Sequence, residues 1–230
     1  MRFDVLTLFP ELIQSHMDFS IMKRAVDDGI IEVNTVNPRD YTLDKHKKVD
    51  DTPYGGGAGM VLMSQPYVDA YENTEKISNT ITIMMTPQGE PFDDNMSNEF
   101  AKYNQIIILC GHYEGFDERI REIIKPKEVS IGDFVLTGGE LPALCIIDSV
   151  SRKIDGTLGK IESAHDDSFS DGLLEYPQYT KPREYRGLQV PEVLLSGNHK
   201  LIEEYRQEQK IIRTKLKRPD LYDKWREKKN

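Results

Sequence analysis

Cysteine and tryptophan are scarce in this chain of 230 residues, which contains two cysteines and one tryptophan. Cys110 and Cys145 are too few for a disulfide framework or for a zinc site with four cysteine ligands. Long apolar runs are missing too, because no stretch approaches the roughly 20 residues that a membrane-spanning helix needs. These absences exclude a disulfide-stapled domain and a protein that crosses membranes through helices.

The sequence also begins without a recognisable secretory signal. Its first residues, Met1-Arg2-Phe3-Asp4, are not a basic segment followed by an apolar one. Together with the low cysteine content, this predicts a cytoplasmic protein. The length predicts one large domain, or one domain with a small appendage.

Positive charge is in short supply overall, and the net charge is −9. Taken alone, this argues against a nucleic-acid partner, because phosphate binding needs Lys and Arg. The average hides a division, however. Residues 176–230 carry 14 Lys and Arg against 8 Asp and Glu, a net charge of +6, so residues 1–175 carry −15. Such asymmetry indicates a basic module that faces nucleic acid.

The first two thirds of the chain alternate apolar strand patterns with helical ones. The apolar runs 80–85 and 105–110 are typical of strands buried on both faces of a parallel sheet. Further strands are expected at 3–9 and 30–37, a mixed strand and loop segment at 129–136, and helices at 11–26, 94–103 and 140–154. This alternation predicts an α/β fold with a mostly parallel sheet.

The pattern fades over residues 156–178, where Gly, Ser, Asp and His dominate, and this favours a linker or an ordered functional loop. A helix follows, with Asn198 as its expected N-cap and Pro219 as its end. Its spacing predicts two faces: an apolar stripe of Leu201, Tyr205, Ile212 and Leu216, and a basic stripe of Arg206, Lys210, Arg213 and Lys217.

Glycine-bearing turns follow the predicted strands. The turns at 86–89, 110–119 and 131–140 are expected at the carboxyl ends of parallel strands, where open α/β sheets bind ligands. An earlier loop carries Gly55, Gly56, Gly57 and Gly59, but it lacks the Gly-Lys-Ser/Thr of a phosphate-binding P-loop and the last glycine of a dinucleotide fingerprint. Each turn alone could be an ordinary connection, and it is their coincidence that favours a ligand site.

Several motifs, in one order along nearly the whole chain, resemble those of the bacterial tRNA (guanine-N1)-methyltransferase family, which belongs to the knotted SPOUT class of methyltransferases. They are PYGGGAGM (53–60), GHYEG (111–115), SIGDFVLTGGEL (130–141), DSF (167–169), PQYTKP (177–182) and LLSGNH (194–199).

The resemblance implies an α/β sheet with a deep trefoil knot, followed by a small all-α C-terminal domain. It implies three parts: a knotted catalytic domain at 1–160, a linker and active-site loop at 161–175, and a helical tRNA-binding domain at 176–230. It further implies a homodimer with shared active sites, and methylation of the guanosine just 3′ of the anticodon. The residues expected to bind the cofactor S-adenosylmethionine are Met84, Met85, Thr86, Pro87, Gly89, Gly111, Tyr113, Glu114, Gly115, Ile131, Gly132, Asp133, Phe134, Val135, Leu136, Gly138, Gly139 and Pro142.

The chemistry of methylating N1 of guanine makes two demands. N1 carries a proton at neutral pH, so a base must remove it, and a cation or hydrogen-bond donor must face the charge that spreads onto O6. The resemblance implies Asp167 as the base and Arg152 as the cation, although Asp166 competes with Asp167 and either side chain could have a purely structural role.

Residues expected to contact the substrate are Gly55, Gly56, Gly57, Gly59, Glu114, Ser163, Ser168 and His199, together with the basic stripe. The histidines have no metal-ligand spacing, so we predict no structural metal, and a need for Mg²⁺ stays open. The alternatives are a SPOUT enzyme that methylates the ribose 2′-oxygen and an RNA-binding module without enzymatic activity.

Overall fold

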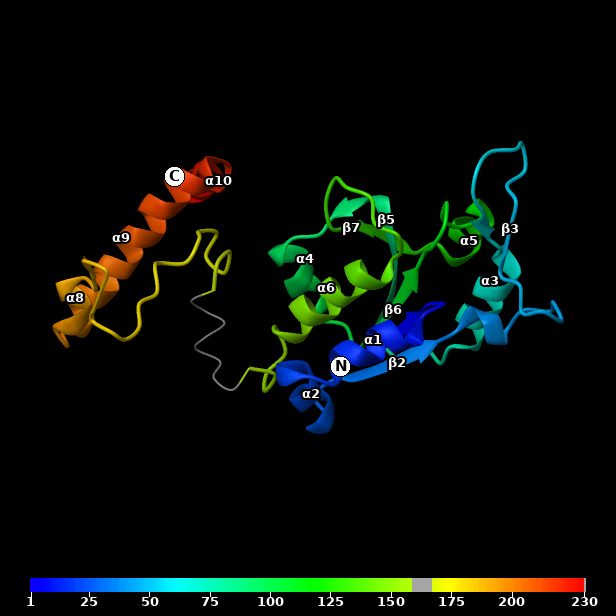
Figure 1. Cartoon of the computed structure of the whole chain (residues 1–230), viewed down its shortest axis with the longest axis horizontal. Helices are drawn as coiled ribbons and strands as arrows, with labels where there is room; N and C mark the ends of the chain where they lie inside the picture. Colours follow the sequence, from blue (N-terminus) through cyan, green and yellow to red (C-terminus); the bar gives the residue numbers. More distant parts are fainter. Residues whose placement is uncertain (159–166, 230) are drawn as a thin grey trace. The chain divides into compact units, whose positions relative to one another are not determined.

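The computed structural model describes residues 1–158 and 167–229. They fall into two compact units that divide between residues 159 and 160. The elements of the first unit (Figure 1) are β1 (Arg2–Leu6), α1 (Pro10–Met17), α2 (Ser20–Asp27), β2 (Glu32–Val36), η1 (Pro38–Asp40), β3 (Asp50–Asp51), β4 (Val61–Leu62), α3 (Ser64–Asn73), β5 (Thr80–Pro91), α4 (Asp94–Phe100), β6 (Gln105–Cys110), α5 (Glu118–Ile124), β7 (Lys127–Ser130) and α6 (Glu140–Ser151).

A five-stranded sheet forms the centre of this unit, in the order β2-β1-β6-β5-β7. Every neighbouring pair in it is parallel. All six residues of β6 are buried, as expected for a central strand whose two faces are both covered. The predicted α/β class with a parallel sheet is confirmed. The trefoil knot stays a prediction, because strand order and register do not define the path of the chain through a loop.

Two apolar cores lie on opposite faces of the sheet. Side chains alternate along β6, so Ile106 and Ile108 enter the first core and Ile107 and Leu109 the second. Helices α1, α2, α4 and α6 cover the first core, and α3 and α5 cover the second. Figure 1 shows α1, α4 and α6 grouped together. Because both faces carry helices, a ligand can reach the sheet only at its ends.

Strand β5 makes an excursion at its carboxyl end. Both Met85 and Glu90 pair with Val129 of β7, so the four residues between them leave the ladder and return to the same partner. The turn predicted at 86–89 is therefore a bulge within a longer strand. It raises a short loop at the sheet edge without changing the partner of β5.

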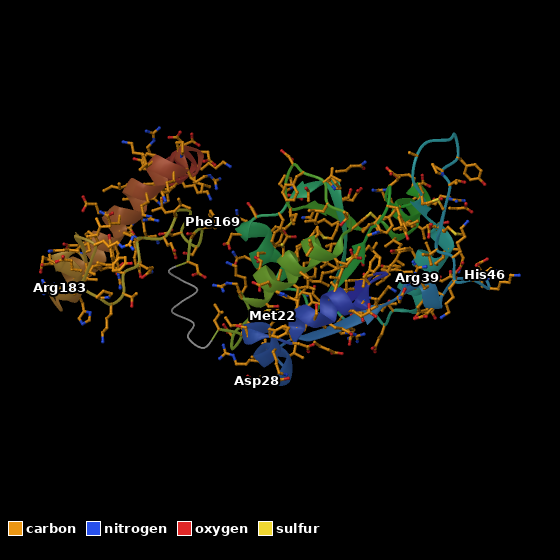
Figure 2. All side chains as sticks on the ribbon, viewed as in Figure 1. Met22, Asp28, Arg39, His46, Phe169 and Arg183 are labelled. Carbon is orange, nitrogen blue, oxygen red and sulfur yellow. The ribbon has the colours of Figure 1, made fainter. Side chains whose placement is uncertain are left out.

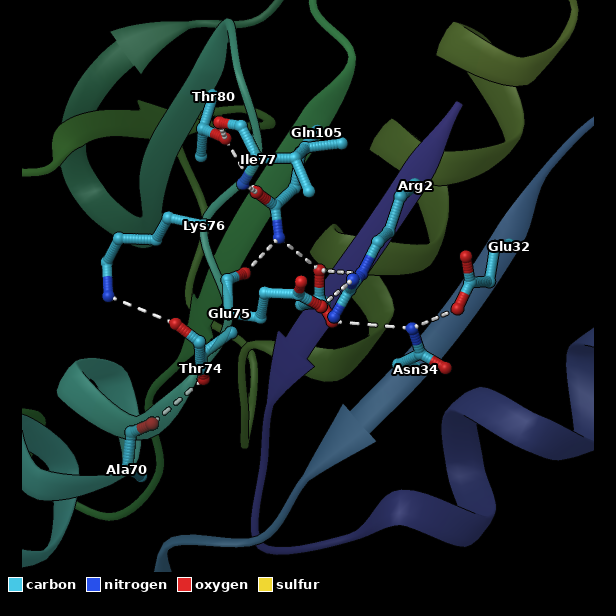
Figure 3. A network of polar contacts seen from close by, with 11 residues as sticks. Arg2, Glu32, Asn34, Ala70, Thr74, Glu75, Lys76, Ile77, Thr80 and Gln105 are labelled. Atoms are coloured by element: carbon cyan, nitrogen blue, oxygen red, sulfur yellow. Dashed lines mark hydrogen bonds and ion pairs between the residues drawn. The ribbon is translucent and has the colours of Figure 1, made fainter.

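The amino ends of the strands carry a closed polar network (Figure 3). Asp4 of β1 is 1% exposed, and its carboxylate pairs with the Arg2 guanidinium at 2.9 Å. Gln105 of β6 donates to the same carboxylate at 2.6 Å. Hydrogen bonds to Asp4 and Glu75 raise the pKa of Arg2 above its ordinary value. The buried charge of Asp4 thus has a cation and a hydrogen-bond donor, which offset the cost of its desolvation.

The second unit consists of β8 (Glu184–Tyr185), β9 (Leu188–Gln189), α8 (Glu192–Leu195), α9 (His199–Lys217) and α10 (Pro219–Lys229). The side chain of Asn198 accepts a hydrogen bond from the Leu201 backbone N–H at 3.3 Å, so the expected N-cap of α9 is confirmed. The prediction of an all-α C-terminal domain was too simple, because β8 and β9 form a two-stranded antiparallel hairpin. Arg183, just before this hairpin, is labelled in Figure 2.

Three predicted helices differ from the observed ones. The helix expected at 94–103 ends at Phe100. The helix expected at 11–26 is broken into α1 and α2, since Phe19 is extended and Ser20 has a φ of 55°. Asp18 and Ser20 favour turns and caps over helix interiors, which explains a break at this point. The helix expected at 140–154 ends at Ser151. The described residues contain no helix with the length and apolar character that crossing a membrane requires.

Candidate ligand pocket at the carboxyl edge of the sheet

A cavity of about 460 Å³ lies where β5, β6 and β7 end. The bulge within β5 and the two loops that follow β6 and β7 form most of its wall. The lining residues are Met85, Thr86, Pro87, Gln88, Gly111, His112, Tyr113, Glu114, Gly115, Phe116, Glu118, Arg121, Val129, Ser130, Ile131, Gly132, Phe134, Val135, Leu136, Thr137, Gly138, Gly139 and Pro142. The sheet edge predicted from the glycine turns is thus where the cavity is found.

Backbone contact between two of these loops leaves no room for a side chain. The Gly139 N–H donates to the Gly111 carbonyl at 2.8 Å. A Cβ added to Gly139 would lie 2.8 Å from both Cys110 Cα and Gly111 N. Glycine is therefore required here for close approach, and the approach joins the second loop to the third at the start of α6.

The earlier glycine loop joins the same assembly. Gly55, Gly56, Gly57 and Gly59 all have positive φ, and a Cβ on Gly59 would overlap the Glu114 side chain. The Glu114 backbone N–H donates to the Met60 carbonyl at 3.0 Å. The structure thus brings this loop against the 111–115 loop, and Glu114 lies where the two meet.

Most residues predicted to bind the cofactor line the cavity, but three do not. Met84 is fully buried in the second core, because neighbouring side chains on a strand point to opposite faces. Gly89 packs against the Val129 backbone, and Asp133 is exposed on its loop. The Met84 side chain therefore packs in the second core, and contacts of Met84, Gly89 and Asp133 with the cofactor stay predictions.

Sequence reasoning did not name several lining residues as cofactor contacts: Phe116 and Glu118 within the predicted turn at 110–119, and Arg121 beyond it. Arg121 forms ion pairs with Glu118 and Glu128, each at 3.0 Å. The spacing of Glu118 and Arg121 on one helical face was the available signal. Because Glu118 and Glu128 neutralise the charge of Arg121, this arginine gives the pocket no net positive charge.

A buried acid lies directly beneath the cavity. Glu140, the first residue of α6, is 3% exposed, and its Oε1 accepts a hydrogen bond from the Thr7 hydroxyl at 2.7 Å. Burial raises the pKa of the Cys110 thiol well above its ordinary value, and the negative charge of Glu140 raises it further. Tyr67 is fully buried in the same region and donates to the Cys110 carbonyl at 3.1 Å.

The two expected catalytic residues belong to different units. Arg152 is half-buried and is the C-cap of α6 in the first unit. Asp167 is half-buried in the second unit, where its carbonyl accepts from the Ser170 hydroxyl at 2.8 Å. The Ser168 hydroxyl accepts from the Glu175 N–H at 3.0 Å, so it serves a local turn. Ser163 and Asp166 lie outside the described residues.

The predicted faces of α9 are placed differently from expectation. Lys210 is 6% exposed and pairs with Asp171 at 2.6 Å, so its ammonium is committed within the unit. The Arg206 guanidinium lies 4.6 Å from the centroid of the Tyr176 ring. Leu201, Ile212 and Leu216 of the expected apolar stripe are exposed instead. Part of the basic stripe, Arg206 and Lys210, therefore packs against other residues of the second unit. His199 and Lys217 are exposed at the two ends of α9.

No group of three His, Cys, Asp or Glu side chains that could hold a metal ion occurs in the described part of the chain. The pocket instead combines apolar side chains, glycine backbone and a few carboxylates. Fold and site together define an α/β protein with a cavity at the carboxyl edge of a parallel sheet, the place where open α/β sheets bind organic ligands.

Comparison with known proteins identifies the family within this class. A family model described as tRNA (Guanine-1)-methyltransferase TrmD matches residues 1–224. The chain is 57% identical to a tRNA (guanine-N(1)-)-methyltransferase of Clostridioides difficile, over 99% of this chain and 100% of the relative. It is 54% and 55% identical to proteins of the same name from Staphylococcus epidermidis and Staphylococcus aureus, over 98% of this chain and 92% of each relative. The chain belongs to the TrmD family of tRNA (guanine-N1)-methyltransferases, as its motifs predict.

The contact at Gly139 leads to a testable prediction. We expect Gly139→Ala to lower the free energy of unfolding by about 1–3 kcal/mol, because the added methyl group overpacks two backbones. Urea denaturation measures the change. Gly56→Ala is the matched control, since nothing lies within 4 Å of its Cβ and the cost is only that of its positive φ. Equal stability of the Gly139→Ala variant and the wild type would contradict the close approach.

Proposed function

We propose that this protein transfers a methyl group from S-adenosylmethionine to N1 of the guanosine at tRNA position 37, just 3′ of the anticodon. The observation that carries the proposal is the pocket formed by the three glycine loops in a chain of the TrmD family. A methyl donor must lie at a site with defined shape, because in-line attack requires the reacting atoms to be held in one geometry.

The residues present fit an adenosyl ligand. Ile131, Phe134 and Leu136 supply apolar surface for a flat base, and the exposed backbone of the glycine loops supplies hydrogen-bonding groups. An added Cβ at Gly138 or Gly139 would overlap protein atoms, so this part of the cavity wall admits only glycine backbone. When bound, S-adenosylmethionine supplies an electrophilic methyl group on a positively charged sulfur.

The protein side of the reaction is proton removal and charge stabilisation. In our proposal the Asp167 carboxylate takes the proton from N1 as N1 forms its bond to the methyl carbon. The bond between that carbon and sulfur breaks, and its electron pair stays on sulfur. Arg152 faces O6 and stabilises the negative charge that spreads there. Glu114 contacts the guanine or the amino group of the cofactor.

In our proposal Arg152 of the first unit and Asp167 of the second both take part in the reaction. We propose a homodimer in which the two subunits share their active sites, acting in the cytoplasm. The first unit holds the cofactor, and the second unit, with its surplus of basic residues, holds the tRNA.

Asp167→Ala tests the reaction and the choice of base. We expect single-turnover methyl transfer to fall at least about 100-fold, because a positioned base contributes 10²–10⁴-fold. Binding of S-adenosylmethionine, measured by calorimetry, should be nearly unchanged. Asp155→Ala, at an exposed acid, is the control, and Asp166→Ala resolves the competing assignment.

Nucleoside mass spectrometry of the product separates the alternatives. N1-methylguanosine only in transcripts with guanosine 3′ of the anticodon supports the proposal, and 2′-O-methylguanosine would contradict it. A wild-type protein that binds tRNA but no methyl donor would instead be an RNA-binding module. Turnover of Asp167→Ala close to wild type would refute the role of Asp167.

The basic residues of α9 lead to a further prediction about tRNA binding. Lys217 is exposed, so we expect Lys217→Ala to reduce the slope of log affinity against log salt by about 0.7–0.9. Lys210→Met is the matched control at the buried ion pair with Asp171. It should lower the unfolding midpoint and leave the slope unchanged. Filter binding over a range of salt concentrations gives both slopes, and a larger effect of Lys210→Met would reverse the assignment.

A further inference from the structure

The buried carboxylate of Glu140 has no cation paired with it within the described residues. Its one side-chain hydrogen bond there comes from a neutral hydroxyl, that of Thr7, at 2.7 Å. In β1, the equally buried Asp4 has the Arg2 guanidinium at 2.9 Å. Burying a charge without a counter-charge costs desolvation free energy. Asp4 has such a counter-charge, whereas Glu140 does not have one within the described residues.

Glu140 lies immediately behind the wall of the cavity. A Cβ added to Gly138 would overlap Glu140 Oε2, and Gly138 and Gly139 both line the cavity. Only glycine backbone therefore separates the carboxylate from the space where a ligand binds. The charge of the Glu140 carboxylate would therefore act on a bound ligand mainly through protein. The effective dielectric constant of protein is lower than that of water, so the electrostatic interaction is stronger than in water.

Groups of the protein around Glu140 offset its charge only in part. The amino end of α6 contributes about half a positive charge. His112, whose buried Nδ1 has no hydrogen-bond partner in the described residues, would lie 2.9 Å from the same added Cβ of Gly138, but it makes no ion pair with Glu140 there. Of the charged side chains that line the cavity, Glu114 and Glu118 are acidic, and Arg121 is shared between Glu118 and Glu128. The region is therefore net negative.

We infer that Glu140 is a specificity-determining residue whose buried negative charge selects the cationic, methylated form of the cofactor over its neutral product. The inference rests on the proposed function, since it takes this pocket as the cofactor site. Methyl transfer converts a sulfonium into a thioether and thereby removes one positive charge from the ligand. The carboxylate stabilises the charged substrate and loses that interaction when the methyl group leaves, which favours exchange of product for fresh cofactor.

The test compares S-adenosylmethionine and S-adenosylhomocysteine in calorimetric titrations of the full-length protein. The measured quantity is the ratio of the Kd for S-adenosylhomocysteine to the Kd for S-adenosylmethionine. We expect Glu140→Gln to lower this ratio about fourfold, as loss of one unit charge roughly 10 Å away predicts at an effective dielectric constant of about 40. Both values come from one preparation, so a partly unfolded sample does not change the ratio.

Three further variants separate charge from packing. Glu32→Gln, at an exposed acid on β2, removes the same net charge elsewhere and should leave the ratio unchanged. Thr7→Val removes the hydrogen bond to Glu140 and should weaken both ligands equally. His112→Asn replaces the imidazole with a neutral amide and should also leave the ratio unchanged, because the inference assigns the effect to the charge of Glu140. A raised ratio in this variant would identify a protonated His112 as the counter-charge and overturn the inference.

Two further outcomes would overturn the inference, and they differ in what they say about the proposed function. Equal weakening of both compounds in Glu140→Gln would give Glu140 a packing role only and overturn the inference, while the proposed function stands. If the wild-type protein binds neither compound, the proposed function fails, and the inference fails with it.

Discussion

The close approach of backbone to backbone at the carboxyl edge of the sheet is the constraint on which the site depends. The Gly139 N–H reaches the Gly111 carbonyl, and β5 leaves its ladder at Met85 and rejoins the same partner residue, Val129. These two features hold the loops after β5, β6 and β7 together around one cavity. Because they are made by main-chain atoms, the shape of the cavity follows from the sheet itself and depends little on flexible side chains.

The buried carboxylates at the two ends of the sheet have different partners. At the amino end, Asp4 is enclosed in a network with Arg2 and Gln105. At the carboxyl end, Glu140 has a neutral partner and lies next to the cavity. A fold can leave a polar group incompletely compensated where a ligand completes it, and the cost in stability is then recovered as binding specificity.

Local sequence patterns predicted the interior of the first unit well. The strand expected at 105–110 is β6 with the same bounds, because a short apolar run rich in β-branched residues favours a strand covered on both faces. The coincidence of glycine turns after strands also predicted where the cavity lies. The extension of β5 to Pro91 was not predictable, since it depends on pairing with Val129, far along the chain.

The second unit was harder to predict because its packing is not periodic. The burial of Lys210 depends on Asp171, which lies 39 residues away in a segment without a pattern. Helical spacing alone assigned Lys210 to a solvated basic face. Likewise, the depth of Glu140 beneath Gly138 is a property of the assembled loops, and the motif that contains both residues identifies the family without showing which acid is buried.

The central claim is that the cavity formed by the three loops is the methyl-donor site. Hydrogen–deuterium exchange of the full-length protein, with and without saturating S-adenosylmethionine, tests it most directly. The account predicts that new protection of backbone amides is concentrated in residues 86–89, 111–115 and 131–139. Unchanged exchange in these three segments, with protection confined to residues 176–229, would contradict it.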